Sequence, residues 1–441
     1  MAVTTPFMGL RGTDQYLTDI IPESFREQIL WLYPTGRAPL TGLTGKMPSK
    51  SLDSTDHNYW VQSLAEQGGA VTDIYDDEAM TDNTISDTAA AGHTLFIKMP
   101  ETQTKGLACV GEFREGHDVA IRYSADSSVD EAGVVTKVVR NGASSYIAVR
   151  LLELAAVAAS GNGLSDADEV YIMGSANPEG GAAVGSINYN PKKFSTKTQI
   201  FKNSINLTKT ALAVAARAGL SKEAKLKDAR RIVAELHAVE MERAFMFGTG
   251  VEEIGDNGQP MRRLTGLFKF LRTYYSAQES SYKYAAAYSG KTWLQGGYDW
   301  FESTLPPIFR YGAMNERVGF CGDLAFVNIN KLIRSLGWEE LKPETKVFGA
   351  RVYDWLSPSG LIHLWPHPLF NIMPSMRKSM FLYDPNDVEY RPLAGRDTKL
   401  SDISIPGVDD VREEYLTECT IEAHFPEKMG LLHGIGDDNA V

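Results

Sequence analysis

The chain has little cysteine and no excess of positive charge. Its three cysteines, Cys109, Cys321 and Cys419, lie far apart among 441 residues and form no CxxC pair. An odd count without paired spacing argues against a disulfide scaffold and suits a reducing compartment. Lys and Arg number 44 against 56 Asp and Glu, so the formal net charge is −12. This balance argues against nucleic-acid binding over the whole surface, although it allows a local basic patch.

Long hydrophobic runs are also missing. No apolar stretch approaches the roughly 18–20 residues that span a membrane. The first residues, Met1–Pro6, lack the basic and apolar regions of a secretory signal. We therefore expect the protein to be made in the cytosol and not to associate with a membrane. The composition, 43% hydrophobic and 23% charged, is that of a globular protein. Because a single core stops growing near roughly 250–300 residues, the chain should fold as two or more subdomains.

The first seventy residues contain little regular structure. A short helical pattern begins at Pro22 and stops before Pro34. The Gly-, Pro- and Thr-rich segment 38–48 cannot build a core of its own, and 58–61 reads as one short strand. Such an arm must lie against something else, either its own chain or a neighbouring copy.

Residues 95–190 change character. Alternating apolar and polar residues predict five short strands, which turn residues separate. These strands are expected at 95–99, 119–123, 134–139, 146–149 and 169–173. Five strands in this space predict a small antiparallel β module, and its Gly-rich flanks suit an insertion on a long loop.

The clearest helical region is 205–248. Thr208 is a candidate N-cap for a helix that ends at Gly219, and Ser221 is a candidate N-cap for a second helix that runs to Phe247. The second helix would be on the order of 40 Å long. Its apolar side is predicted to hold Leu226, Ala229, Val233, Leu236 and Phe247. Its solvated side is predicted to hold Lys225, Lys227, Arg230, Arg231, Glu235 and Glu242.

The remaining chain mixes helices and strands. A helix is expected over 293–311, broken at Pro306–Pro307, and another over 328–336. Strands are expected at 347–353, 361–365, 380–383 and 414–423.

Motifs for catalysis, cofactors and metals are missing. The sequence contains no GxxxxGK[ST], HExxH or GxSxG pattern. His363 and His367 have a metal-binding spacing, but prolines interrupt the helix that this spacing needs. His237 and Glu240 are assigned to a solvated helix face. We expect no catalytic, cofactor-binding or metal-ligating residue, no cofactor and no enzymatic activity.

Basic and aromatic residues offer two weaker signals. The cluster Lys222, Lys225, Lys227, Arg230 and Arg231 could contact a phosphate backbone without sequence preference, or could be a solvated helix face. Tryptophans are enriched in the cores of interfaces. The positions in question are Trp31, Trp60 and Trp338. The sequence alone does not separate interface anchors from ordinary packing.

The order of several segments resembles one family. These segments are 37–41, 58–60, 65–68, 197–202, 207–210, 348–349, 382–385, 390–393 and 414–417. They are similar in kind and order to segments of tailed-bacteriophage major capsid proteins. The resemblance implies an α+β Hong Kong 97-type capsid fold, in the subgroup with a β module inserted in the extension loop.

The resemblance also implies a division of the chain. It assigns 1–75 to an N-terminal arm and 76–195 to the extension loop, with the insertion at about 105–180. Residues 196–270 are assigned to a peripheral domain with a spine helix at 221–247. Residues 271–400 are assigned to an axial domain, and 401–441 to a strand that returns to the peripheral domain. We expect Leu40, Trp60 and Trp31 in subunit interfaces, and Lys225, Arg230 and Arg231 facing nucleic acid.

The implied function is an icosahedral shell around double-stranded DNA. Copies would assemble as pentamers and hexamers in the host cytoplasm and end in the virion, with a portal and scaffold or decoration proteins as partners. Some relatives cross-link Lys to Asn, but no motif here licenses that transfer. One alternative is a cellular nanocompartment with the same fold. Another is a hydrolase that uses Asp, Glu and His from separate loops in a deep pocket.

Overall fold

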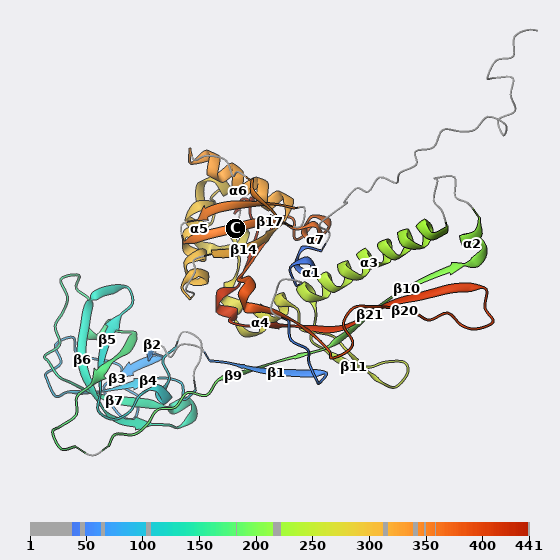
Figure 1. Ribbon diagram of the computed structural model, residues 1–441. Coiled ribbons are helices and arrows are strands. Elements are labelled where there is room, and N and C mark those ends of the chain that lie inside the picture. Colours follow the sequence, from blue (N-terminus) through green and yellow to red (C-terminus); the bar gives the residue numbers. More distant parts are fainter. Residues whose placement is uncertain are drawn as a thin grey trace, which may run out of the picture. The chain divides into compact units, whose positions relative to one another are not determined.

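The computed structural model describes residues 38–44, 49–62, 67–102, 107–181, 183–214, 222–311, 316–337, 343–347, 350–357 and 359–439. They form two compact units (Figure 1). The body combines Met1–Val61 with Lys193–Val441, and the β module is the stretch Gln62–Lys192. Among the described residues, no helix is both long and apolar enough to cross a membrane.

A seven-stranded antiparallel sheet forms the β module. Its strands are β2 (Gly68–Ala70), β3 (Asp73–Tyr75), β4 (Thr94–Lys98), β5 (His117–Tyr123), β6 (Asp126–Val139), β7 (Tyr146–Leu151) and β8 (Glu169–Ser175), in the sheet order β2-β8-β5-β6-β7-β4-β3. All five predicted strands are present, because alternation is the local signature of a half-buried strand. The sheet also takes in β2 and β3, and together with β4 these strands lie before the predicted insertion at about 105–180.

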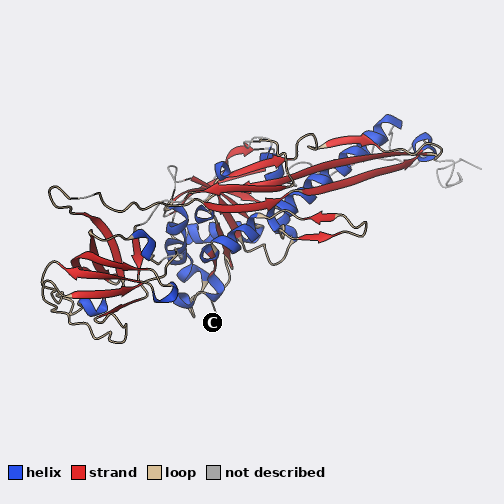
Figure 2. Ribbon diagram, turned by 90° about the horizontal axis from the view of Figure 1, so that it is seen from below, coloured by secondary structure: helices blue, strands red, loops and turns tan. Residues whose placement is uncertain are grey.

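The body contains a long sheet with a helix beside it. The sheet order is β10-β21-β19, with β20 also paired to β21. The strands are β10 (Gln199–Thr208), β19 (Val388–Pro392), β20 (Lys399–Asp402) and β21 (Asp410–Ala423), and the helix is α3 (Lys222–Phe247). Figure 2 shows β10 and β21 running beside α3. Phe201 and Ile205 of β10 are buried, whereas Lys202 and Asn206 between and after them are exposed. Strand β10 therefore has one covered face and one open face, whereas β21 is buried on both faces from residue 417 to residue 423.

The buried side of α3 differs from the predicted one. Leu236, expected on the apolar side, is 50% exposed. The buried positions are instead His237, Met241 and Phe245, with Glu242 beside them. The assignments of His237 and Glu242 to a solvated face were therefore wrong. The reason is that buried hydrogen bonds satisfy His237 and Glu242, so the burial of this helix does not follow hydropathy alone.

A second seven-stranded sheet lies in the body, in the order β13-β22-β18-β14-β17-β16-β15. Its strands are β13 (Glu279–Ser281), β14 (Glu316–Cys321), β15 (Pro343–Val347), β16 (Ala350–Ser357), β17 (Gly360–Pro366), β18 (Met380–Tyr383) and β22 (Gly430–His433). The helices that accompany it in sequence are α4 (Leu267–Tyr274), α5 (Trp293–Phe309), α6 (Asp323–Ser335) and α7 (Pro368–Ile372). The predicted single strand 347–353 is thus two strands, which pair as a hairpin.

Helix α5 does not break at its prolines. Pro306 and Pro307 lie inside the helix, which continues to Phe309. Leu305, Ile308 and Phe309 are buried on both sides of the proline pair. Their burial offsets the lost backbone hydrogen bonds, so the predicted break was wrong. Helix α6 begins before the predicted residue 328.

Smaller elements complete the body. They are α1 (Pro39–Thr44), β1 (Asp56–Val61), β9 (Lys192–Lys197), α2 (Lys209–Ala213), β11 (Glu252–Ile254) and β12 (Pro260–Arg262). Strand β1 pairs with β9, and β11 pairs with β12. Thr208 caps α2 as predicted, since its hydroxyl accepts a hydrogen bond from the N–H of Ala211. The described part of this helix is shorter than predicted, and the predicted helix at 22 lies outside the described residues.

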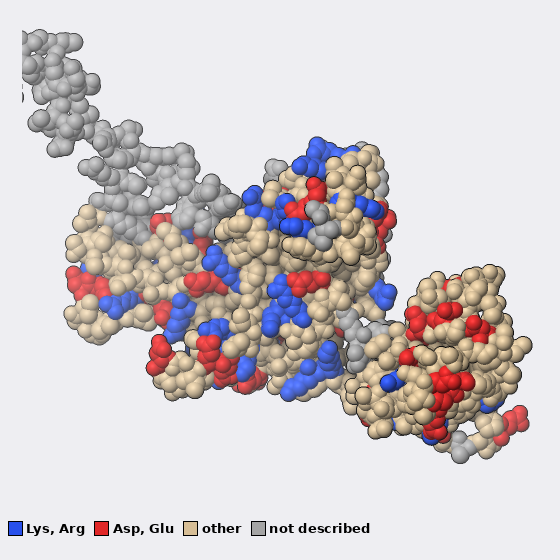
Figure 3. Space-filling model, turned by 180° about the vertical axis from the view of Figure 1, so that it is seen from behind, with Lys and Arg blue, Asp and Glu red and all other residues tan. Residues whose placement is uncertain are grey.

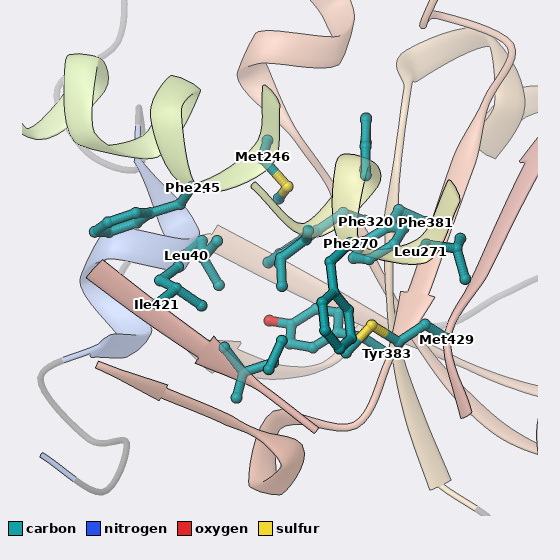
Figure 4. Packing of buried hydrophobic residues seen from close by; sticks show 14 of the residues in the cluster. Leu40, Phe245, Met246, Phe270, Leu271, Phe320, Phe381, Tyr383, Ile421 and Met429 are labelled. Carbon is teal, nitrogen blue, oxygen red and sulfur yellow. The ribbon is translucent and has the colours of Figure 1, made fainter. Parts of the chain in front are cut away.

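The main core of the body joins segments that are distant in sequence. Figure 4 shows Leu40 from α1 close to Phe245 of α3 and Ile421 of β21. All three side chains are at least 98% buried and belong to one apolar cluster. Helix α1 is therefore part of the body's own core.

Candidate assembly surfaces

Helix α1 is held at its N-terminal end by a carboxylate from α3. The N–H groups of Leu40 and Thr41 donate to Glu242 Oε1 and Oε2, at 2.9 and 2.6 Å, and the Thr41 hydroxyl donates to Oε2 at 2.8 Å. The first N–H groups of a helix have no partner within the helix and favour a negative charge. Glu242 therefore caps α1 from a residue two hundred positions later in the chain.

A buried histidine completes this anchor. His367 Nε2 lies 2.7 Å from Glu242 Oε1, and both side chains are fully buried. His367 Nδ1 accepts a hydrogen bond from the N–H of Leu369. The proton of a neutral imidazole therefore lies on Nε2 and points at Glu242. Four donors surround one carboxylate, which is the arrangement that makes a buried charge tolerable.

A second carboxylate, Glu422, holds strand β1. His57 Nε2, Arg391 Nε and His424 Nε2 lie 2.8, 2.6 and 3.1 Å from its oxygens. Burial alone would raise the pKa of Glu422, but the hydrogen bonds from the two histidines and the Arg391 guanidinium hold it far below its usual value. The Tyr59 hydroxyl adds a hydrogen bond to the Ala423 carbonyl at 2.9 Å. The segment from 39 to 61 is therefore fastened to the body at both of its described ends.

The predicted interface residues fall in different places. Leu40 has no exposed surface in the single chain and packs in that chain's core, which weakens its assignment to an interface; that assignment stays a prediction. Trp60 is 60% exposed between the buried Tyr59 and Val61. Alternation along β1 turns it outward. Trp31 and Trp338 lie outside the described residues.

The predicted basic cluster is partly used inside the chain. Arg230 forms a bidentate ion pair with Glu413 of β21, in which Arg230 Nε lies 2.6 Å from Glu413 Oε2. Arg231 lies 3.9 Å from Glu235, and its side chain is half exposed. Lys225 lies in α3, but its side chain is outside the described part of the chain. The charge of Arg230 is therefore balanced locally, which weakens its assignment to nucleic acid.

The fold connects a serine, a histidine and a glutamate side chain through two successive hydrogen bonds. Ser379 Oγ lies 2.8 Å from His433 Nδ1, and His433 Nε2 lies 3.2 Å from Glu279 Oε1. Burial lowers the pKa of His433, and the hydrogen bond with Glu279 opposes this shift. Ser379 has no exposed surface, so no substrate can reach its hydroxyl in this structure. The relay has the residue types of a hydrolytic triad without the accessible nucleophile that such a site needs.

His363 and His367, the pair with metal-binding spacing, each contact a carboxylate of their own chain. His363 Nδ1 lies 2.7 Å from Asp354 Oδ1, and His367 serves Glu242. No group of three or more His, Cys, Asp and Glu that could hold a metal ion occurs in the described ranges.

Comparison with known proteins decides the family. A family model described as "SU10 major capsid protein" matches residues 6–436. The chain belongs to the SU10 major capsid protein family. The major capsid protein of Pseudomonas phage PaMx41 is 22% identical over 395 residues, which cover 89% of this chain and 84% of that protein.

Two solved structures are similar at lower sequence identity. A chain of Mycobacterium phage Bobi matches with 8% identity and a TM-score of 0.46, over 97% of this chain and 99% of its own. The capsid of an empty GTA particle matches with 10% identity and a TM-score of 0.43, over 96% of this chain and 97% of its own.

The family match confirms the prediction of a tailed-phage major capsid protein, and the helices and strands of the structure confirm the predicted α+β class. It favours this function over the cellular nanocompartment. Glu242 and Glu422 hold α1 and β1 to the body through buried hydrogen bonds. Sequence reasoning placed Glu242 on the solvated side of its helix, which was wrong, and it missed Glu422. The available signal for Glu242 was its place inside the apolar run of Met241, Phe245 and Met246.

Proposed function

We propose that copies of this capsid protein assemble as pentamers and hexamers into a closed icosahedral shell. The shell would form in the host cytoplasm, receive double-stranded DNA and carry a portal at one vertex. The observation that carries this proposal is the family match over nearly the whole chain. Scaffold and decoration proteins are further candidate partners.

Exposed apolar side chains in the body support repeated contacts between copies. The most exposed large ones among the described residues of the body are Trp60, Val214, Ile254, Tyr284, Leu356 and Ile372, each more than 59% exposed. Many modest interfaces of this kind become strong together when symmetry repeats them. We assign Trp60 to such an interface, because its position on β1 presents a large apolar ring that no residue of its own strand covers.

The division of the chain follows the same proposal. We assign residues 1–75 to the arm, 76–195 to the extension loop, 196–270 and 401–441 to a peripheral domain, and 271–400 to an axial domain. The compact unit Gln62–Lys192 and the separate sheets of the body support this division in outline. Contacts to DNA would use Lys225 and Arg231 without sequence preference, whereas Arg230 is engaged with Glu413.

Size-exclusion chromatography with negative-stain electron microscopy tests this function. Purified chain should form closed shells or rings of five and six copies. A small discrete oligomer, such as a dimer, at every concentration and salt would contradict the proposal. Shells purified from infected cells should contain DNA, whereas an enzyme cargo in its place would indicate a nanocompartment.

The variant Trp60→Ala tests the interface assignment. Because Trp60 is 60% exposed, we expect its loss to change the free energy of unfolding by no more than about 0.5 kcal/mol. Loss of an interface tryptophan should nevertheless raise the protein concentration at which shells appear, by about tenfold or more. Trp60→Phe is the matched control and should retain most assembly. Equal assembly of all three proteins would remove Trp60 from the interface.

A further inference from the structure

The negative charge of the chain is concentrated in the β module. Residues 62–192 contain 19 Asp and Glu against 8 Lys and Arg, whereas the body contains 37 against 36. The module therefore carries a net charge of −11 and the body a net charge of −1. On the face drawn in Figure 3, acidic patches dominate the module, whereas acidic and basic side chains are mixed across the body.

Part of this charge is built into the loops of the module. Asp77 accepts hydrogen bonds from the N–H groups of Asp82 and Thr81, at 2.8 and 2.9 Å. These bonds hold the pKa of Asp77 below its usual value. Asp126 accepts from the hydroxyl and N–H of Ser128, and these and further hydrogen bonds lower its pKa as well. Such donors are neutral, so they favour the ionised carboxylate without cancelling its charge. The module is therefore negatively charged at any pH near neutrality.

The basic residues of the module offset only part of this charge. Lys137 pairs with Glu78 and Arg122 pairs with Asp130, and all four side chains are between 41% and 57% exposed. Each such pair is neutral as a whole. The excess of 11 carboxylates is what a neighbouring copy of the module would meet.

We propose that repulsion between β modules places shell assembly under the control of ionic strength. At low salt the modules of approaching copies repel one another, and at higher salt this repulsion is screened so that the nearly neutral bodies can join. The inference rests on the proposed shell function, since it concerns many copies brought close together. The length over which charges act is about 30 Å at 0.01 M ionic strength and about 10 Å at 0.1 M. At about 0.01 M the screening length is similar to the size of a domain, so whole modules can repel one another. At about 0.1 M it is much shorter than a domain, so the repulsion is largely screened.

A matched pair of triple variants tests the proposal. Glu115→Lys, Glu153→Lys and Glu179→Lys replace three exposed residues of the module and change its net charge from −11 to −5. Asp53→Lys, Asp256→Lys and Asp409→Lys make the same change in charge at exposed positions of the body. The onset concentration of shell formation is measured by light scattering and electron microscopy between about 0.01 M and about 0.15 M NaCl. Circular dichroism and thermal unfolding verify that each variant is folded.

For the native chain we expect the onset concentration to fall roughly tenfold as salt rises over this range. The module variant should lose most of this dependence and assemble at low salt, whereas the body variant should keep it. The proposal is overturned if salt has no effect on the native chain, if salt weakens assembly, or if the body variant loses the dependence as fully as the module variant. Absence of shells from all three proteins at every salt would instead overturn the proposed function.

Discussion

Replacing Glu242 should weaken the attachment of helix α1 to the rest of the body. The carboxylate accepts hydrogen bonds from Leu40, Thr41 and His367 in a buried site. Each hydrogen bond to a charged group contributes about 1.5–3 kcal/mol, but part of this sum offsets the cost of burying the carboxylate. Removing one partner of a buried charged contact typically costs about 3–5 kcal/mol. We therefore expect Glu242→Ala to lower the stability of the docked segment by about 3–5 kcal/mol.

Hydrogen–deuterium exchange of the backbone amides measures this effect directly. A loss of about 3–5 kcal/mol corresponds to exchange that is faster by about a hundredfold to several thousandfold at Leu40 and Thr41, up to the rate of an unprotected chain. Glu242→Gln retains an acceptor and should show a smaller increase. The control is Glu240→Gln on the same helix, whose exposed side chain contacts Asn203, and it should leave these amides protected. Unchanged protection in Glu242→Ala would refute the capping role of this carboxylate.

Three further outcomes follow from buried groups. The Arg317 guanidinium donates hydrogen bonds to the carbonyls of Glu316 and Tyr311 at 2.8 and 3.0 Å. Arg317→Met should therefore lower the free energy of unfolding of the body by about 3 kcal/mol, as measured by chemical denaturation. The control Arg310→Met, at an exposed position, should have little effect. Burial raises the pKa of Cys321 and Cys419 to about 12, so neither thiol should react with a disulfide reagent at pH 8 until the chain unfolds; fast reaction of the native protein would contradict their burial. The pKa of Glu422 is lower in the folded than in the unfolded chain, so its contribution to stability is present above about pH 4.3 and is lost as the pH falls further. Glu422→Gln should flatten the acid limb of a stability–pH curve, and an unchanged curve would exclude this role.

The sequence predicted those features that depend on neighbouring residues. The strands of the β module were found because alternation is visible within a few positions, and the hydroxyl cap at Thr208 was found for the same reason. The extent of α3 was also predicted within one residue at each end.

Features that depend on distant partners were missed or misplaced. His237 is buried because its ring nitrogens reach Asn203 of β10 and Thr417 of β21, at 2.5 and 2.7 Å. Neither partner is visible in the pattern of the helix itself, so hydropathy placed Leu236 inside and His237 outside. The site at Glu422 gathers residues from positions 57, 391, 422 and 424. Spacing along one chain cannot predict such a convergence.

A structure of the assembled shell by electron cryomicroscopy tests the central claim most directly. We predict closed shells in which Glu242 binds Leu40 and Thr41 of its own chain and a neighbouring copy covers Trp60. Shells in which Trp60 stays exposed to solvent, or in which Leu40 of each chain packs into another copy, would contradict the anchored arm. A chain that forms no shell under any condition, alone or with its scaffold, would contradict the function itself.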